Sequence, residues 1–242
     1  MFDHVTIRVT DRDASEAVYD TVLRPLAIDQ SYRTDAFSLW HEFGITGATA
    51  ENPVTRRLHI GFRAPSRQHV DEFWRVGTEA GYRDDGPPGP RPGYSDDYYG
   101  AFLLDPDGNS AEAVHDRDAR RPGVIDHLWI RVADVAAAKA FYDTIAPHAG
   151  LTRGTDTPER VGFRGAGGSL SLVRGTPTEH VHLAFPAHDN AVVERFHEAA
   201  TSAGYASNGG PGERPRYHPG YYAAFVFDPD GNNIEVVNHN RD

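Results

Sequence analysis

The sequence contains no cysteine among its 242 residues, so neither disulfide bonds nor thiolate metal ligands are available to it. Any metal ion must therefore be held by His, Asp, Glu or backbone oxygens. The chain also lacks an apolar run of 18 residues, and its start, MFDHVTIRV, lacks the basic and long apolar segments of a signal peptide. These absences predict a cytoplasmic protein with no membrane partner.

Basic residues are outnumbered: 24 Lys and Arg against 35 Asp and Glu give a net charge of -11. This balance argues against a nucleic-acid partner and for a freely soluble protein. The length is sufficient for one large domain or for two small domains with real cores.

The most informative feature is an internal repeat, in which the two halves align without a gap at an offset of 123 residues. The aligned segments include FDHVTIRVTD (2–11) with IDHLWIRVAD (125–134), LHIGFRA (58–64) with VHLAFPA (181–187), and YYGAFLLDPDGNSAEAV (98–114) with YYAAFVFDPDGNNIEVV (221–237). Residues 119–123, ARRPG, have the composition of an interdomain linker. The sequence therefore predicts two domains, 1–118 and 124–242, joined by this linker.

Within each half, the hydrophobic pattern predicts two βαβββ units. Alternation over residues 4–10 indicates a half-buried strand, and helical spacing over 12–27 indicates a helix. After short strands, the pattern restarts with a strand at 57–63, a helix at about 66–80, an extended Gly/Pro loop and a hairpin turned by DPDGN (105–109). The predicted class is α+β, with four βαβββ modules in the chain.

Of the 13 histidines, only two pairs coincide at the offset of 123, and a glutamate recurs after each DPDGN turn. Strand parity places His4 on the face opposite Val5 and Ile7, so the recurring side chains lie on polar faces of three strands per half. If the sheet curls so that these faces point inward, two His and one Glu converge in each half; otherwise they are strand-surface residues. Such a set suits Fe(II), Mn(II), Ni(II) or Zn(II), and open coordination positions favour oxygen chemistry at Fe(II).

The segments DHVTIRV, LHIGF and DPDGNSAEAV, and again DHLWIRV, VHLAF and DPDGNNIEVV, resemble the glyoxalase / bleomycin-resistance / extradiol dioxygenase (vicinal oxygen chelate) superfamily in a tandem two-domain form. The resemblance implies that the four modules form two half-open barrels. Each barrel would hold a divalent metal, with Fe2+ or Mn2+ favoured and Ni2+ or Zn2+ open, that chelates adjacent oxygens of a substrate. The implied ligands are His4, His59, Glu112, His127, His182 and Glu235.

The repeat permits two groupings of these ligands. The modules could pair within each half. Alternatively, the first module of one half could pair with the second module of the other, in which case His4 would join His182 and Glu235.

The resemblance leaves three functions open. The first is a metal-dependent enzyme with dioxygenase-like chemistry on a small-molecule substrate with vicinal oxygens, acting as a monomer or homodimer. The second is a glyoxalase-type lyase or isomerase, for which the resemblance implies a fourth ligand; Glu42 is a candidate, but its aligned position holds Gly165. The third is a resistance protein that sequesters a small molecule such as an antibiotic.

Further candidate site residues surround the second hairpin of each half. Tyr hydroxyls can hydrogen-bond a metal-bound oxygen, a guanidinium can bind a carboxylate or phosphate, and His can act as an acid or base, although each type is also common in the core or in solvent. The candidate catalytic residues are Tyr98, Tyr221 and His218, with His180 as an alternative base, and the candidate substrate-binding residues are Arg91, Tyr94, Arg214 and Tyr217. Arg120 and Arg121 of the linker are expected to be solvated.

Overall fold

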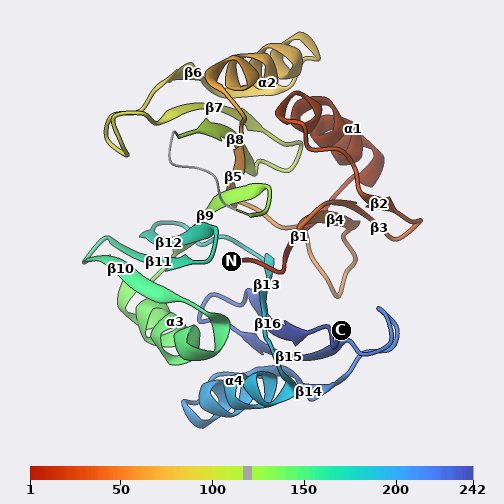
Figure 1. Ribbon diagram of the computed structural model, residues 1–242, viewed down its shortest axis with the longest axis vertical. Helices are drawn as coiled ribbons and strands as arrows, with labels where there is room; N and C mark the ends of the chain where they lie inside the picture. Colours follow the sequence, from red (N-terminus) through yellow and green to blue (C-terminus); the bar gives the residue numbers. More distant parts are fainter. Residues whose placement is uncertain (117–121, 242) are drawn as a thin grey trace. The chain divides into compact units, whose positions relative to one another are not determined.

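The computed structural model describes residues 1–116 and 122–241, and it confirms the α+β class and the four βαβββ modules (Figure 1). Residues 119–121 of the predicted linker, with Arg120 and Arg121, lie outside the described residues.

The first module comprises β1 (His4–Val9), α1 (Arg12–Leu23) followed by the 3-10 helix η1 (Arg24–Leu26), β2 (Tyr32–Arg33), β3 (Phe37–Trp40) and β4 (Phe43–Gly47). The second comprises β5 (His59–Arg63), α2 (Arg67–Glu79), β6 (Arg83–Pro90), β7 (Tyr99–Leu104) and β8 (Ser110–His115). The third comprises β9 (Ile125–Val132), α3 (Val135–Ala149), β10 (Thr152–Thr157), β11 (Arg160–Gly165) and β12 (Gly168–Arg174). The fourth comprises β13 (His182–Pro186), α4 (Asn190–Ser202), β14 (Ser207–Glu213), β15 (Tyr222–Phe227) and β16 (Asn233–Asn238).

The chain forms two compact units, which we call unit A (Thr6–Trp129) and unit B (Met1–Val5 with Ile130–Asp242). Their boundaries fall inside β1 and β9, so each of these two strands contributes to both units. Unit A contains the strand orders β1-β4-β3-β2 and β9-β5-β8-β7-β6, and unit B contains β14-β15-β16-β13-β1 and β10-β11-β12-β9. The domain limits drawn from the repeat at residues 119–123 stay a prediction.

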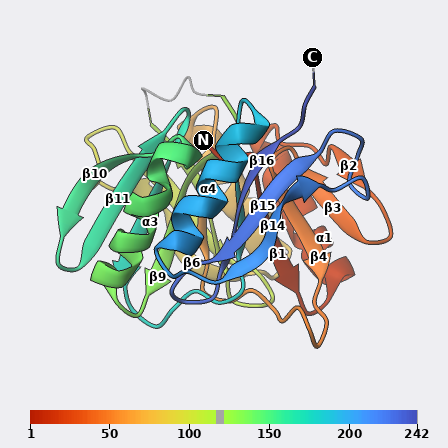
Figure 2. The ribbon, with the colours of Figure 1, turned by 90° about the horizontal axis from the view of Figure 1, so that it is seen from below.

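Each sheet has one face that packs under helices, as the alternation in the sequence predicts. The side chains of Ile7 and Val9 on β1 are fully buried, and Val70 and Phe73 on α2 are buried against strands of the same unit. In Figure 1, α2 lies along β7 and β8, and Figure 2 shows α4 lying across β14, β15 and β16. Because the helices occupy one face, the polar side chains of these strands are on the other face, where a site can form.

The Gly/Pro segment before each final hairpin was predicted as an extended loop, and this prediction is wrong: it forms β6 in unit A and β14 in unit B. Both are edge strands, and the pairing of β6 with β7 shifts register on either side of Gly86. Proline is tolerated there because an edge strand needs hydrogen bonds on one side only, and the bulges absorb the residues that cannot pair.

The DPDGN turn joins β7 and β8 into the predicted antiparallel hairpin. Gly108 takes the positive φ of 87° that the turn requires, and Asp105 Oδ1 accepts the backbone N–H of Asn109 at 2.8 Å. The Asn109 side chain also reaches outside the hairpin, because its Oδ1 accepts the backbone N–H of Leu58. The turn therefore fixes the start of β5 beside β8, and with it the position of Glu112 relative to His59.

Candidate metal centres

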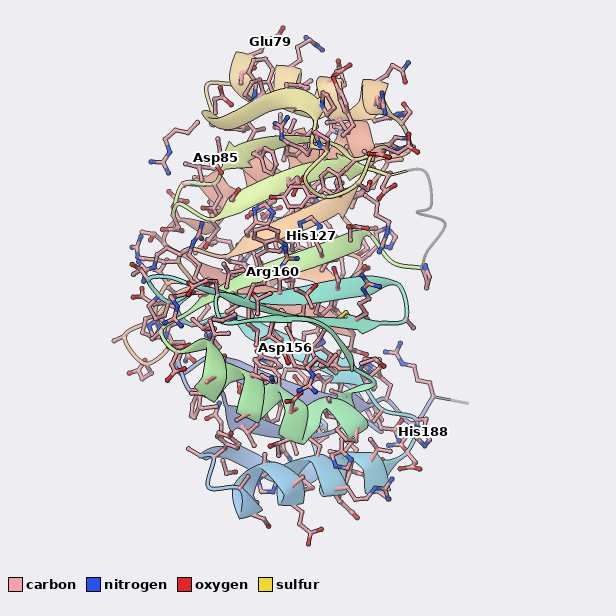
Figure 3. All side chains as sticks on the ribbon, turned by 90° about the vertical axis from the view of Figure 1, so that its left-hand side faces the viewer. Glu79, Asp85, His127, Asp156, Arg160 and His188 are labelled. Atoms are coloured by element: carbon pink, nitrogen blue, oxygen red, sulfur yellow. The ribbon has the colours of Figure 1, made fainter. Side chains whose placement is uncertain are left out.

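Three of the predicted ligands meet in unit A, and we call this group cluster A: His59, Glu112 and His127. His59 Nε2 lies 3.0 Å from Glu112 Oε2 and 3.1 Å from His127 Nε2, and His127 Nε2 lies 3.2 Å from Glu112 Oε2. The strands β9, β5 and β8 position them, with Gly61 opposite both His127 and Glu112 in the two ladders. His127 is labelled in Figure 3.

The other three ligands meet in unit B as cluster B: His4, His182 and Glu235. His182 Nε2 lies 2.9 Å from Glu235 Oε2 and 3.0 Å from His4 Nε2, while His4 Nε2 lies 3.5 Å from the same carboxylate oxygen. His4 reaches this unit because the backbone N–H of Asp3 donates to the carbonyl of Ala184, next to β13. The structure thus brings His4 to His182 and Glu235, the second of the two groupings that the repeat permits.

The spacing of the donor atoms fits a divalent transition metal. Donors bonded at about 2.1 Å and at right angles stand about 3.0 Å apart, whereas tetrahedral donors stand about 3.4 Å apart. The three separations in cluster A are 3.0, 3.1 and 3.2 Å, close to the right-angle value. Two neutral imidazoles and a carboxylate on one face of an octahedron form a set known from oxygen-activating Fe(II) sites.

Each imidazole is oriented through its other ring nitrogen. In cluster A, His127 Nδ1 lies 3.0 Å from Asp126 Oδ2, and His59 Nδ1 lies 3.2 Å from Ser110 Oγ, which itself donates to Asp85 (labelled in Figure 3). Such outer partners fix the ring orientation and raise the basicity of the nitrogen that faces the centre.

Cluster B has the corresponding acid beside His4, whereas the outer ring nitrogen of His182 accepts from an amide N–H. His4 Nδ1 lies 2.8 Å from Asp3 Oδ1, and His182 Nδ1 lies 2.7 Å from Asn233 Nδ2. Sequence reasoning missed these residues, although each recurs as a polar residue at the offset of 123, and an Asp before a strand-borne His was the available signal.

The predicted tyrosines hold the glutamates. Tyr98 donates its hydroxyl to Glu112 Oε1 at 2.8 Å, and Tyr221 donates to Glu235 Oε1 at 2.6 Å. Burial, followed by the charge of the adjacent carboxylate, raises the pKa of both hydroxyls far above the ordinary value. Each tyrosine is therefore a neutral hydrogen-bond donor that leaves Oε2 of its glutamate directed at the two imidazoles.

Both clusters favour a positive charge at their centre. Burial alone would raise the pKa of Glu112 and Glu235, but hydrogen bonds from the paired imidazoles lower it to about 2 in each. Burial would lower the pKa of His4 and His127, yet hydrogen bonds to Asp3 and Asp126 and to the glutamates raise it to about 9. Without a metal, a proton supplies this charge, and a bound cation must displace that proton.

The candidate substrate-binding arginines are engaged with their own loops. Arg91 donates to the carbonyls of Pro87 and Pro90, and Arg214 donates to those of Gly210 and Glu213. Each guanidinium also lies over a phenylalanine ring, Phe102 or Phe225, at 5.3 and 5.5 Å. These contacts stabilise the local conformation of the segments β6 and β14. The role of the two arginines in substrate binding stays a prediction.

The candidate substrate-binding tyrosines lie closer to the centres. Tyr94 and Tyr217 are 51% and 52% exposed, and each ring contacts the tyrosine that holds the glutamate, at 4.9 Å from Tyr98 and 4.8 Å from Tyr221.

The histidines found only in the second half lie outside the metal clusters. His218 Nε2 lies 2.8 Å from His239 Nδ1, and His239 Nε2 lies 2.8 Å from Asp3, so His218 is linked to His4 through two intervening side chains. His180 adopts a left-handed φ of 58° before β13, as Arg57 does before β5 with 62°.

Glu42, the fourth-ligand candidate, holds the backbone of unit A. Its Oε1 accepts the backbone N–H groups of Val124 and Ile125 at the start of β9. Over the described ranges, 1–116 and 122–241, each cluster groups three His, Asp or Glu donors.

Glycine makes room for cluster A. A Cβ on Gly61 would lie 2.3 Å from Cε1 of His127, and a Cβ on Gly100 would lie 2.5 Å from Glu112 Oε1. The aligned residues of the second half are Ala184 and Ala223. The two centres therefore have the same types of ligand, two His and one Glu, but differ in the residues that pack beside them.

Comparison with known proteins shows the family and agrees with the fold. Residues 1–113 and 124–236 each match the Glyoxalase/Bleomycin resistance protein/Dioxygenase superfamily, so the chain belongs to this family. A comparison with curated proteins gives no match.

Solved structures that are similar along nearly the entire chain include the two that follow. Glyoxalase I from Zea mays has 18% sequence identity and a TM-score of 0.69, with 98% of this chain and 92% of that chain covered. A protein described as "putative dioxygenase from Bacillus subtilis subsp. subtilis str. 168" has 14% identity and a TM-score of 0.66, with 99% and 85% covered. At these identities the likeness concerns the fold.

Within the described residues, the helices are too short or too polar to span a bilayer.

Proposed function

We propose that this protein is a metal-dependent enzyme with dioxygenase-like chemistry on a small molecule that carries two adjacent oxygens. The observation that supports this most is the donor set, in which two imidazoles and one carboxylate converge at the spacing of one octahedral face. Three protein donors leave coordination positions for two substrate oxygens and for O2. A glyoxalase-type site would use a fourth protein ligand, and Glu42 is bound to backbone N–H groups instead.

The side chains in each cluster have separable tasks. His59, Glu112 and His127 would hold the ion in unit A, and His4, His182 and Glu235 would hold it in unit B. When bound, the ion would act as a Lewis acid and as a template for the adjacent oxygens.

The surrounding residues keep this donor set in place. Asp126 and Asp3 keep the Nε2 atoms of His127 and His4 directed at the centre, while Tyr98 keeps the carboxylate of Glu112 turned the same way.

Metal stoichiometry tests the site. Untagged protein loaded anaerobically with Fe(II) or Mn(II) and then desalted should retain two ions per chain by mass spectrometry. Glu112→Gln and Glu235→Gln should each retain one ion, while the control Glu79→Gln, at an exposed position at the end of α2, should retain two. Protein that retains no ion, and whose thermal stability added Fe(II) or Mn(II) leaves unchanged, would contradict the enzyme proposal and leave the small-molecule-binding alternative.

The reaction class needs a separate assay. Oxygen uptake by the Fe(II)-loaded protein with a panel of catechols should exceed its turnover of methylglyoxal–thiol adducts. The opposite result would assign the site to the glyoxalase-type reaction.

A further inference from the structure

Two histidines, His218 and His239, support cluster B from outside its ligand set. His239 directly follows β16, the strand that carries Glu235, and His218 lies in the segment between β14 and β15. The aligned residues of the first half are Asp116 and Ser95. The pair therefore belongs to the second half, and the repeat does not account for it.

His239 is bonded to the aspartate that orients His4. Its Nε2 lies 2.8 Å from Asp3 Oδ2, and the other oxygen, Asp3 Oδ1, lies 2.8 Å from His4 Nδ1. An ionised carboxylate only accepts hydrogen bonds, so both imidazoles donate to it and each oxygen has a donor. The carboxylate of Asp3 is thus held from two sides, and His239 helps to set its angle to the His4 ring.

The ring of His239 also contacts the tyrosine that holds Glu235. Its centroid lies 5.2 Å from that of Tyr221, with the ring planes at 88°, and Tyr221 donates its hydroxyl to Glu235 Oε1 at 2.6 Å. His239 therefore contacts the orienting partners of two donors in cluster B, namely Asp3 beside His4 and Tyr221 beside Glu235.

His218 fixes the orientation of His239. The two rings stack at 15° with their centroids 5.1 Å apart, and His218 Nε2 lies 2.8 Å from His239 Nδ1. His218 is itself held, because its Nδ1 lies 2.7 Å from the carbonyl oxygen of Pro219. Both ring nitrogens of His239 are thus engaged, one by His218 and the other by Asp3.

In unit A, the corresponding aspartate has a different neighbour. Asp126 Oδ2 lies 3.0 Å from His127 Nδ1, and Asp126 Oδ1 lies 3.4 Å from Arg63 Nε. The residue aligned with Arg63 is Pro186, whose side chain has no donor. Each half thus places a different side chain beside its orienting aspartate, an arginine on β5 in unit A and a histidine after β16 in unit B.

We propose that His239 is a positioning residue of cluster B: it holds Asp3, and through Asp3 the ring of His4, in the orientation that a bound ion requires. This rests on the proposed function, because the orientation matters only if cluster B binds an ion. His218 acts one step further out, by fixing the ring of His239. The orienting aspartate of cluster A has Arg63 beside it, so we expect metal binding at cluster A to be independent of the histidine pair.

The test compares two amide variants at position 239. The amide N–H of a glutamine lies close to the place of a histidine Nε2, whereas the amide N–H of an asparagine lies close to the place of Nδ1. His239→Gln therefore keeps a donor for Asp3, while His239→Asn keeps a polar group beside His218 and has no donor for Asp3. Both variants lose the ring that contacts Tyr221, so a difference between them reports on the bond to Asp3.

Metal affinity is measured with Zn2+, which has no redox chemistry, by competition with a chromophoric chelator. In the Glu112→Gln background, the retained ion reports on cluster B, and His239→Asn should weaken its binding about tenfold more than His239→Gln does. In the Glu235→Gln background, the retained ion reports on cluster A, and both variants should leave its affinity unchanged.

The outcomes separate this proposal from the one on which it rests. A Glu112→Gln protein that binds no zinc defeats the proposed function at cluster B and leaves His239 no ion to serve. One bound zinc ion with equal affinities in His239→Asn and His239→Gln overturns the positioning role alone. An equal loss of affinity at cluster A also overturns it, because the substitution then disturbs the fold and not the orientation of Asp3.

Discussion

At the scale of single residues, each glutamate of the two centres has both carboxylate oxygens committed. Oε2 of Glu112 faces two imidazoles, while Oε1 accepts the hydroxyl of Tyr98 at 2.8 Å. Glu235 is held in the same way by Tyr221. A glutamate carboxylate stands on three rotatable bonds and would otherwise sample several orientations, so the tyrosine reduces the entropy lost when an ion binds.

We therefore predict that Tyr98→Phe weakens metal binding at cluster A by about tenfold or more, because the ligand loses its orienting hydrogen bond. Competition with a chromophoric chelator measures the affinity. The neighbouring Tyr99→Phe is a matched control, since the Tyr99 hydroxyl donates to the exposed Asp71, away from the cluster. Equal affinities in the two variants would contradict the orienting role.

A second prediction concerns Asp228, in the turn before Glu235. Burial raises the pKa of Asp228 to about 6, although hydrogen bonds from Asn232 oppose this. The folded pKa thus exceeds the ordinary value of 3.8, so the stabilising contribution is complete below pH 3.8 and is lost as the pH rises through 6. From pH 4 to pH 7, we expect the unfolding free energy to lose on the order of 2 kcal/mol through this residue.

The check is the pH dependence of urea unfolding in wild-type protein and in Asp228→Asn. The variant cannot ionise, so its unfolding free energy should fall less between pH 4 and pH 7, and the histidines contribute equally to both proteins. Parallel curves would show that Asp228 has an ordinary pKa.

At the scale of secondary-structure elements, glycines on β5 and β7 give cluster A its shape. Gly61 lies between His127 and Glu112 in the ladders, and its missing side chain leaves the space that the His127 ring occupies. In unit B the aligned Ala184 is fully buried and present beside an intact cluster. The two units thus place different residues, Gly61 and Ala184, at the same position beside their clusters.

Gly61→Ala should therefore lose the ion of cluster A and retain that of cluster B, because the added Cβ would lie 2.3 Å from the His127 ring. Metal analysis after loading and desalting gives the stoichiometry, expected to fall from two ions to one. Gly47→Ala on β4 is the control, since a Cβ there meets no atom within 4 Å. Retention of two ions in Gly61→Ala would show that His127 can move without leaving the centre.

The elements also show where sequence reasoning succeeds and fails. The alternation of apolar and polar residues correctly predicted that Val9 is in the core and that His59 lies on the polar face of its strand. Successive side chains of a strand point to opposite faces, so burial of one face determines which residues lie on the other. Helix α1 shows the limit of helical spacing as a guide to burial: Tyr19 is buried, whereas Ala14 and Ala17 are exposed. Strand β6 was missed because its Gly/Pro composition is that of a loop, and only its place at the sheet edge permits it to pair.

At the scale of the whole molecule, ions bound at the two candidate centres should raise the free energy of unfolding. An ion that binds the folded chain at a free concentration 100 times its Kd stabilises it by about 2.7 kcal/mol per site. For a chain of this size we expect Mn2+ to raise Tm by about 5 °C or more and excess EDTA to reverse the shift.

Differential scanning calorimetry measures this effect, and the double variant Glu112→Gln with Glu235→Gln is the control. It should show no Mn2+-dependent shift. An equal shift in the double variant would place the stabilising ion outside the two clusters.

The six predicted ligands all lie in the two centres, but their grouping could not be derived from the sequence. A repeat in register is compatible with either pairing of its modules, because each half supplies the same residues at the same spacing. What decides it is a strand contact, the hydrogen bond from the N–H of Asp3 to Ala184, which carries His4 to β13. Two residues as far apart in the sequence as Asp3 and Ala184 leave no local sequence pattern from which their contact could be predicted.

This grouping of the ligands makes each candidate centre depend on both halves of the chain. The first half supplies two ligands of cluster A and one of cluster B, and the second half supplies the reverse. Loss of a whole half would therefore remove ligands from both centres, whereas a single substitution removes a ligand from one centre only. Neither half holds a complete centre by itself, so an isolated half is expected to bind no ion at a full set of three ligands.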